Sequence, residues 1–340
     1  MKKSIFAVCD LEASYARNLA EYMNERRHAP FEVQAFTNLD SLEDFSSQNH
    51  IELLLISTNA MCDRVKQMDV ERIIILSEGE TMADIGENPF VYKYQPSDQL
   101  IAEVMGYYAE TGPQVMPEPL SLSATELIGV YSPLGRLGKT AFALTLGEIL
   151  GEKKKVLYLN LENFNGFETL FDQNYSADIS DLLYFARQNE GNLIYRLSGM
   201  IRSLGRLDYI PPAFSPGDLR DVGHEEWISL FSRMEAWGDY EVIILDLGSQ
   251  IEDVFQILKR CGRVYMPVLD DPVSRAKLLQ FEKNLRALEC GEVEEKLVRL
   301  HLPRWGRGEE LELPQTLAGG TLGRYVRQLL ETGRDEGGEP

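Results

Sequence analysis

Hydrophobic and polar positions alternate along residues 1–110 in a pattern that predicts buried strands separated by amphipathic helices. Short, almost wholly apolar runs predict strands at Ser4–Cys9, Phe31–Phe36, Ile51–Ile56, Arg72–Leu76 and Phe90–Tyr94. Apolar residues three or four positions apart predict helices at Glu12–Arg26, Leu39–Phe45 and Ser97–Tyr108. Buried strands that alternate with helices are typical of a parallel sheet covered on both faces, so this part of the chain is predicted to be an α/β domain.

The same alternation returns over residues 124–330 and predicts a second α/β domain. After an apolar run that begins at Leu127, strands are predicted at Val156–Leu161, Leu207–Pro212, Glu241–Asp246, Arg263–Val268 and Lys296–Leu302. Helices are predicted at Ala141–Leu150, Ala177–Gln188, Asn192–Leu204, Trp227–Trp237, Val273–Leu288 and Thr321–Leu330. The proline-rich residues 111–123 are expected to be a linker, and the polar, glycine-rich residues 331–340 a disordered tail.

The sequence Gly138-Lys139-Thr140 stands between a predicted strand and a predicted helix, which is the order of a phosphate-binding loop. Lys139 is expected to neutralise β- and γ-phosphate oxygens, and the Thr140 hydroxyl to bind Mg²⁺. Pro133 stands where the full pattern has its first glycine. The residues expected to contact the phosphates are Gly135, Arg136, Leu137, Gly138, Lys139, Thr140 and Ala141.

Two acidic residues follow other predicted strands of the second domain. Asp246 ends an apolar strand, where a carboxylate can hold Mg²⁺ near the phosphates, so Thr140 and Asp246 are the predicted metal site. The strand Val156–Leu161 runs directly into Asn160-Leu161-Glu162. Because the carboxyl ends of parallel strands meet at one edge of a sheet, we expect these side chains to lie beside the phosphate loop.

Composition excludes several classes of function. The 340 residues carry a formal net charge of −20, which opposes non-specific binding to DNA and to anionic lipid. The four cysteines are scattered and form no Cys-x-x-Cys pair, so neither a zinc site nor a disulfide framework is indicated. The first apolar stretch ends at Asp10, too early for a signal peptide, and no apolar run is long enough to span a bilayer. The chain is therefore expected to be cytoplasmic.

From Glu126 to about Leu302, the second domain resembles the deviant-Walker P-loop ATPases of the MinD/ParA group. The resemblance implies ATP and Mg²⁺ as ligands, a homodimer, and Lys139 and Glu162 as the catalytic residues. The group's signature lysine, which reaches the partner's phosphates, falls at Leu134, and its second loop glycine falls at Arg136. Its Asp-x-Asp segment is here Asn160-x-Glu162. These departures predict that hydrolysis is weak or absent, because a missing trans cation costs several powers of ten by analogy with arginine fingers.

The first domain resembles a response-regulator receiver, mostly through its pattern of elements. Asp10 and Glu12 match the acidic pair after the first strand, and Ser77 matches the switch hydroxyl. Ser57 stands at the position of the phospho-accepting aspartate, and the lysine expected before Pro96 is displaced to Lys93. Without an acceptor carboxylate no acyl phosphate can form, so the domain is interpreted as a pseudo-receiver that binds partners. The alternative is an unrelated flavodoxin-like domain.

A receiver-like domain in front of such an ATPase resembles the TadZ/CpaE family of tight-adherence (Flp) pilus systems. The resemblance implies an ATP-binding localisation or scaffold factor whose first domain binds pilus or secretion proteins, which recruit it to the cell pole or inner membrane. Nucleic acid is not expected as a specific partner, and membrane association is expected to be indirect.

The alternative is a MinD/ParA-type positioning ATPase of division or partition, acting at the membrane or the nucleoid. Thr321–Leu330, with Arg324 and Arg327, could then be a membrane-binding amphipathic helix, or it could dock onto its own domain. A P-loop tyrosine kinase is not indicated, because Tyr325 is the only tyrosine near this end of the chain.

Overall fold

The structure is a computed structural model that describes residues 4–25, 31–79, 88–111, 125–188, 193–303 and 318–332. The chain divides into two compact units. The first consists of Met1–Met116 and Gly191–Gly199, and the second of Pro117–Glu190 and Met200–Pro340. The predicted linker, apart from residue 111, and the predicted tail beyond residue 332 lie outside the described residues.

The first unit contains a five-stranded parallel sheet whose strand order is β2-β1-β3-β4-β5. This is the flavodoxin-like order. Its strands are β1 (Ser4–Cys9), β2 (Phe31–Phe36), β3 (Ile51–Ser57), β4 (Val70–Ser77) and β5 (Phe90–Tyr92). Its helices include α1 (Ala13–Glu25), α2 (Leu39–Ser46) and α4 (Ser97–Thr111), with 3₁₀ turns η1 (Thr58–Ala60) and η2 (Val65–Gln67). The predicted α/β fold with a parallel, helix-covered sheet is confirmed.

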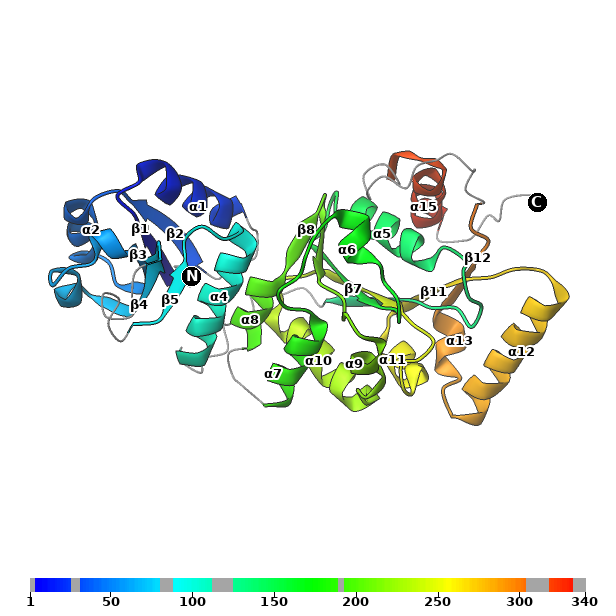
Figure 1. Cartoon of the computed structure of the whole chain (residues 1–340). Coiled ribbons are helices and arrows are strands. Elements are labelled where there is room, and N and C mark those ends of the chain that lie inside the picture. Colours follow the sequence, from blue (N-terminus) through cyan, green and yellow to red (C-terminus); the bar gives the residue numbers. More distant parts are fainter. Residues whose placement is uncertain are drawn as a thin grey trace. The chain divides into compact units, whose positions relative to one another are not determined.

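One helix of the first unit comes from a distant part of the chain. Helix α8 (Leu193–Met200) lies beside α4 (Figure 1) and places the Tyr195 ring in the core of this unit. That ring packs edge-on against Tyr108, at 4.7 Å between centroids, and stacks on Phe31 at 6.1 Å. The first unit is therefore completed by residues from the middle of the predicted ATPase domain.

The predicted helix over Asn192–Leu204 is wrong in its second half. Helix α8 ends at Met200, and β8 (Arg202–Leu204) pairs with β9 (Leu207–Ile210) in antiparallel orientation. The reason is Gly205, whose φ of 65° allows a tight two-residue turn between Leu204 and Leu207. A three-residue strand carries too little pattern to be distinguished from a helix end.

The second unit contains a seven-stranded sheet of order β12-β11-β6-β10-β7-β9-β8, in which only β8 runs antiparallel to its neighbour. Its other strands are β6 (Glu126–Val130), β7 (Val156–Leu161), β10 (Val242–Leu247), β11 (Arg263–Pro267) and β12 (Leu297–Leu300). Its helices include α5 (Lys139–Leu150), α6 (Phe167–Phe171), α7 (Ile179–Arg187), α9 (Pro216–Arg220), α10 (His224–Trp237), α11 (Val254–Arg260), α12 (Pro272–Ala287), α13 (Glu292–Lys296) and α15 (Thr321–Thr332).

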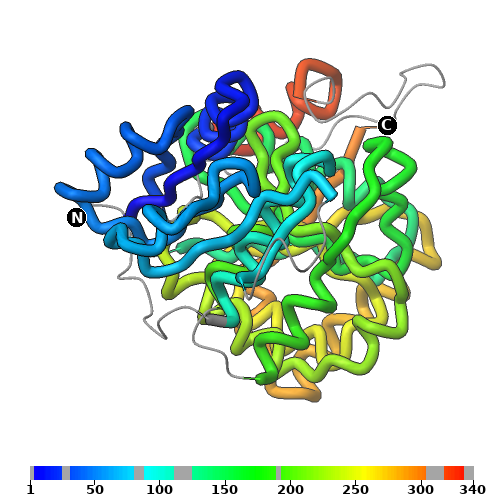
Figure 2. Tube along the Cα trace, turned by 60° about the vertical axis from the view of Figure 1, so that its left-hand side comes forward, coloured from blue at the N-terminus to red at the C-terminus, as the bar shows by residue number. Residues whose placement is uncertain are grey.

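Helices cover both faces of this sheet, with α5 and α15 on one face and α10, α11 and α13 on the other (Figure 1). The turned view in Figure 2 also shows α15, in red, against the body of the second unit. Leu322, Val326 and Leu329 of α15 are buried in the core that α5 shares with the sheet. The C-terminal helix is thus part of the fold of this unit.

The strand register places the predicted site residues at one level of the sheet. Asp246 of β10 lies opposite Val130, the last residue of β6, and opposite Asn160 of β7. The segments that follow these strands therefore begin side by side at the carboxyl edge. This is the edge at which open α/β sheets bind their ligands.

Candidate nucleotide-binding site

The loop between β6 and α5 is fixed by two hydrogen bonds of the Ser132 side chain and by two left-handed residues. Ser132 Oγ donates to the carbonyl oxygen of Pro267 at 2.7 Å and accepts from the backbone N–H of Leu134 at 3.1 Å. Arg136 and Gly138 have positive φ angles of 63° and 75°. These angles turn the chain sharply, so that α5 begins at the next residue after the loop.

The predicted phosphate-contacting segment, residues 135–141, forms this loop and the first turn of α5. The backbone N–H groups of a first helical turn have no partner within the helix, and the helix dipole adds partial positive charge there. A Cβ atom added at Gly135 would meet nothing within 4 Å, so the space beside this residue is open. The loop therefore has the features of an anion-binding helix N-terminus.

Lys139 is held by a side chain that directly follows β7 and by a backbone carbonyl at the end of β10. Its ammonium Nζ lies 2.5 Å from Glu162 Oε1 and donates to the carbonyl oxygen of Leu247 at 2.6 Å. The lysine side chain is 9% exposed, and that of Glu162 is 25% exposed. The structure thus brings together the two predicted catalytic residues as an ion pair. A bound phosphate would compete with Glu162 for this ammonium group.

Thr140 and Asp246, the predicted metal site, are in direct contact. The Thr140 hydroxyl donates to Asp246 Oδ2 at 2.7 Å, and the Tyr158 hydroxyl donates to the same oxygen at 3.0 Å. Asp246 is fully buried, and its Oδ1 atom has no hydrogen-bond partner among the described residues. Burial raises the pKa of Asp246 and outweighs Lys139 and Thr140, which lower it.

These residues fit a magnesium ion. A buried carboxylate oxygen without a partner is costly, and a cation that binds it removes that cost. The Thr140 hydroxyl beside it supplies a second oxygen of the kind that Mg²⁺ prefers. When bound, the ion would neutralise phosphate charge, while Lys139 and the N–H groups of α5 orient the phosphates.

The resemblance to MinD/ParA ATPases leads one to expect a carboxylate at position 160. The Asn160 side chain that stands there has a structural role. Its amide Nδ2 donates to the Tyr158 hydroxyl at 3.0 Å, and its Oδ1 accepts from the backbone N–H of Glu162 at 2.9 Å. Its side chain is buried, so it holds the end of β7 in shape. An aspartate could not donate to Tyr158, which explains how an amide is accommodated at this position.

The strand β10 approaches the end of β7 at Gly248. A Cβ atom there would lie 2.6 Å from the carbonyl oxygen of Leu161, so no larger residue fits without displacing the backbone. The Gly248 N–H donates to that same Leu161 carbonyl at 3.0 Å and is therefore not directed at a ligand.

Leu134 and Arg136, the two loop residues that depart from the MinD/ParA pattern, differ in exposure. Leu134, at the position of the signature lysine, is buried, and its backbone is tied to Ser132. Arg136 is exposed on the loop. Tyr158 and the Leu247 carbonyl, which no motif indicated, complete the contacts around Asp246 and Lys139.

The first unit has its own polar cluster at the carboxyl edge of its sheet. Lys93 Nζ lies 2.7 Å from Glu78 Oε1, 2.9 Å from Asp10 Oδ2 and 3.1 Å from Glu12 Oε2, and its side chain is 1% exposed. Burial opposes the charge of Lys93, but the hydrogen bonds to these carboxylates raise its pKa above the ordinary value. The displaced lysine thus reaches the acidic pair predicted from the sequence.

Ser57, at the predicted acceptor position, is buried at the end of β3. Its hydroxyl has no hydrogen-bond partner within the described residues. A serine hydroxyl cannot form an acyl phosphate, so the interpretation as a pseudo-receiver stays a prediction that agrees with this geometry.

The C-terminal helix has no free apolar face for a membrane. Its apolar residues pack on α5, and Arg327 forms two hydrogen bonds to the Glu152 carboxylate, at 2.6 and 3.1 Å. Within the described part of the chain, no helix combines the length and the apolar character needed to cross a bilayer.

Comparison with protein-family models gave no match, and neither did comparison with curated proteins. Solved structures similar to this chain are P-loop ATPases of the ParA and MinD families. One is a putative plasmid partition protein from Borrelia burgdorferi B31 bound to AMPPNP, with 16% identity over 63% of this chain and 83% of that chain, at a TM-score of 0.43.

Two further solved structures are similar to the same extent. The MinC:MinD cell division complex from Aquifex aeolicus matches at 18% identity over 57% of this chain and 77% of that chain, with a TM-score of 0.40. The McdA–ATP complex from Cyanothece matches at 13% identity over 62% of this chain and 91% of that chain, also at 0.40.

Proposed function

We propose that this protein is an ATP-binding scaffold that positions other proteins, and that ATP with Mg²⁺ promotes its homodimer while hydrolysis is weak or absent. The observation that carries the proposal is the group formed by Lys139, Glu162, Thr140 and Asp246 at the N-terminus of α5. Residues of these kinds hold a nucleoside triphosphate and its metal in P-loop proteins, which supports the proposal.

Slow turnover follows from the residues around that group. Leu134 is apolar and buried where a cation would have to reach a partner's phosphates. Asn160 uses its amide within its own strand end. Glu162 is the carboxylate that remains of the Asp-x-Asp segment to orient a water molecule, and it is paired with Lys139. The nucleotide then acts as a slowly exchanging switch between two states of assembly.

We further propose that the first unit is the partner-binding module and that the partners belong to a tight-adherence pilus or related secretion assembly. The support is its flavodoxin-like strand order together with the loss of an acceptor carboxylate at Ser57. Recruitment to the cell pole or inner membrane would then depend on those partner proteins, since the chain is strongly acidic and α15 is docked on its own unit.

The second candidate is a positioning ATPase of division or partition, acting directly on membrane or nucleoid. Co-sedimentation with anionic liposomes, and separately with duplex DNA, distinguishes the two candidates in the presence and absence of ATP and Mg²⁺. If the protein is a scaffold, it should stay in the supernatant with liposomes and with DNA, whether or not ATP and Mg²⁺ are present. ATP-dependent pelleting that Lys139→Ala abolishes would favour the second candidate instead.

A further inference from the structure

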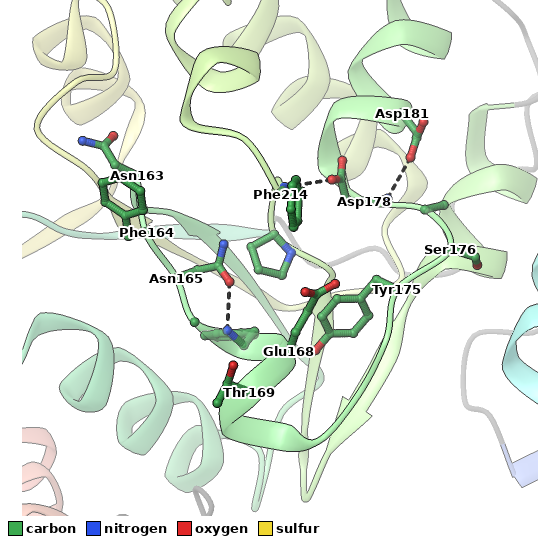
Figure 3. A pocket seen from close by; sticks show the side chains of 14 residues that line it. Asn163, Phe164, Asn165, Glu168, Thr169, Tyr175, Ser176, Asp178, Asp181 and Phe214 are labelled. Carbon is green, nitrogen blue, oxygen red and sulfur yellow. Dashed lines mark hydrogen bonds between the residues drawn. The ribbon is translucent and has the colours of Figure 1, made fainter.

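The second unit contains a surface hollow of about 390 Å³ at the carboxyl edge of its sheet. Its walls come from the loop after β7, helix α6, the start of α7 and the loop after β9 (Figure 3). Its first lining residue, Asn163, directly follows Glu162 in the chain. The hollow is therefore adjacent to the nucleotide site but is formed by other side chains.

Large aromatic side chains stand exposed at this hollow. Phe164 is 88% exposed and Phe214 is 82% exposed, whereas Tyr175 is half-buried. Figure 3 shows Phe164 on one side of the hollow and Tyr175 on the other. Aromatic residues exposed to this degree around a concavity are typical of an interaction site, because burying them against a partner releases ordered water.

The polar lining of the hollow is acidic. Carboxylates come from Glu168, Asp178 and Asp181, and none of the described residues that line it is a lysine, arginine or histidine. Asp178 accepts from the backbone N–H groups of Ser180, at 2.7 Å, and Phe214, at 3.0 Å. Asp181 accepts from the backbone N–H of Asp178 at 2.9 Å, which completes the cap of α7.

These bonds keep two of the carboxylates in fixed positions. Glu168 is different, since no described residue forms a hydrogen bond or an ion pair with its carboxylate. It is exposed on α6 and lies beside Tyr175 in Figure 3. A cationic group entering the hollow would therefore meet carboxylates on two sides. One of them, the Glu168 carboxylate, has no other partner that competes for the cation.

A second hollow of about 370 Å³ shares Asp181 with the first. It adds the carboxylates of Asp218 and Asp221, and its one arginine, Arg187, is paired with Glu226. The acidic surface thus extends beyond the exposed rings of Phe164 and Phe214. Because the same face of a second copy would carry the same charges, and nucleic acid is a polyanion, charge complementarity favours a basic protein segment over either.

We propose that the first hollow docks a basic segment of a partner protein, with an arginine or lysine side chain held between Phe164 and Phe214 and its charge at the Glu168 carboxylate. A guanidinium group suits such a site, since it stacks on aromatic rings and donates to carboxylates at the same time. The net charge of −20 would also speed the approach of a basic partner. This docking does not require nucleotide and goes beyond the function proposed above.

Fluorescence anisotropy with a short fluorescein-labelled peptide, in which arginine and leucine alternate, tests the proposal at physiological salt. A peptide with citrulline in place of arginine has nearly the same shape without the charge. The variant of the first hollow, called the groove variant, carries both Phe164→Ser and Glu168→Gln. Its matched control carries both Leu279→Ser and Glu252→Gln. Leu279 is an exposed apolar residue and Glu252 an exposed acidic residue, and neither lines either hollow.

We expect the wild type and the control variant to bind the arginine peptide equally. The groove variant should bind it about tenfold more weakly, and the citrulline peptide should lose a similar factor with the wild type. Thermal unfolding of both variants should match the wild type, since the replaced side chains are exposed. Equal binding by groove and control variants would overturn the proposal, as would failure of the wild type to bind the arginine peptide.

Discussion

Lys139 Nζ lies 2.5 Å from Glu162 Oε1, so the lysine expected to bind phosphate is already paired with the carboxylate expected to assist hydrolysis. Nucleotide binding must therefore replace one anionic partner of Lys139 by another. If the protein binds ATP as proposed, Glu162 and the phosphates compete for the same ammonium group.

Glu162→Gln should tighten ATP binding, because glutamine competes less well for the Lys139 ammonium. We expect an increase in affinity of about threefold to tenfold, which corresponds to roughly 1 kcal/mol. Titration of a fluorescent ATP analogue in the presence of Mg²⁺ measures it. Any residual hydrolysis should fall in the same variant. Weaker binding by Glu162→Gln would show that Glu162 supports the nucleotide rather than competing with it.

Asp246→Asn should have opposite effects on the free and the nucleotide-bound protein. Without ligand, the variant no longer buries a carboxylate with an unpartnered oxygen, so we expect its melting temperature to rise by about 2–4 °C, equivalent to roughly 1 kcal/mol. With ATP and Mg²⁺, the wild type should gain stability that the variant lacks. Differential scanning fluorimetry in both conditions measures this. A variant that ATP and Mg²⁺ stabilise as strongly as the wild type would argue against Asp246 as a metal ligand.

Lys93→Met should destabilise the first unit, because it leaves three carboxylates around an apolar side chain. We expect a loss of about 2–3 kcal/mol in the free energy of unfolding, less than for a fully buried pair because Glu12 and Glu78 reach solvent. Lys66→Met, which breaks an exposed pair with Asp63, is the control and should change stability by less than about 0.5 kcal/mol.

The raised pKa of Lys93 fixes the pH range of this effect. A lysine whose pKa is raised on folding contributes its full stabilisation below its ordinary value of 10.5 and loses it only above that value. The difference between wild type and Lys93→Met in urea unfolding should therefore be the same at neutral pH and at about pH 9. A difference that disappears over this range would contradict the ion cluster.

Tyr195→Ala should weaken the first unit although Tyr195 lies far from it in the sequence. Removal of a core aromatic side chain costs about 3–5 kcal/mol. Amide hydrogen exchange should increase in β2 and α4, whose Phe31 and Tyr108 contact the Tyr195 ring. Tyr184→Ala on α7 is the control, because that ring is 56% exposed. Unchanged protection of β2 and α4 would show that α8 is dispensable to this unit.

The sequence predicted most strands and helices because each is long and has a clear period. It also predicted that Asp246, Thr140 and Lys139 would lie together, since parallel strands end at one edge. It could not predict that α8 completes the first unit, because the spacing of its apolar residues does not identify the surface they pack on. Nor could it show that the Gly248 N–H is bonded to the Leu161 carbonyl, which depends on the register of β7 and β10.

The most direct test of the proposed function is the mass of the protein in solution by multi-angle light scattering, with and without ATP and Mg²⁺. The wild type should be a monomer without nucleotide and a dimer with it, and Lys139→Ala should remain a monomer in both conditions. A mass that does not respond to ATP and Mg²⁺, or a dimer that Lys139→Ala still forms with nucleotide, would contradict an ATP-switched scaffold.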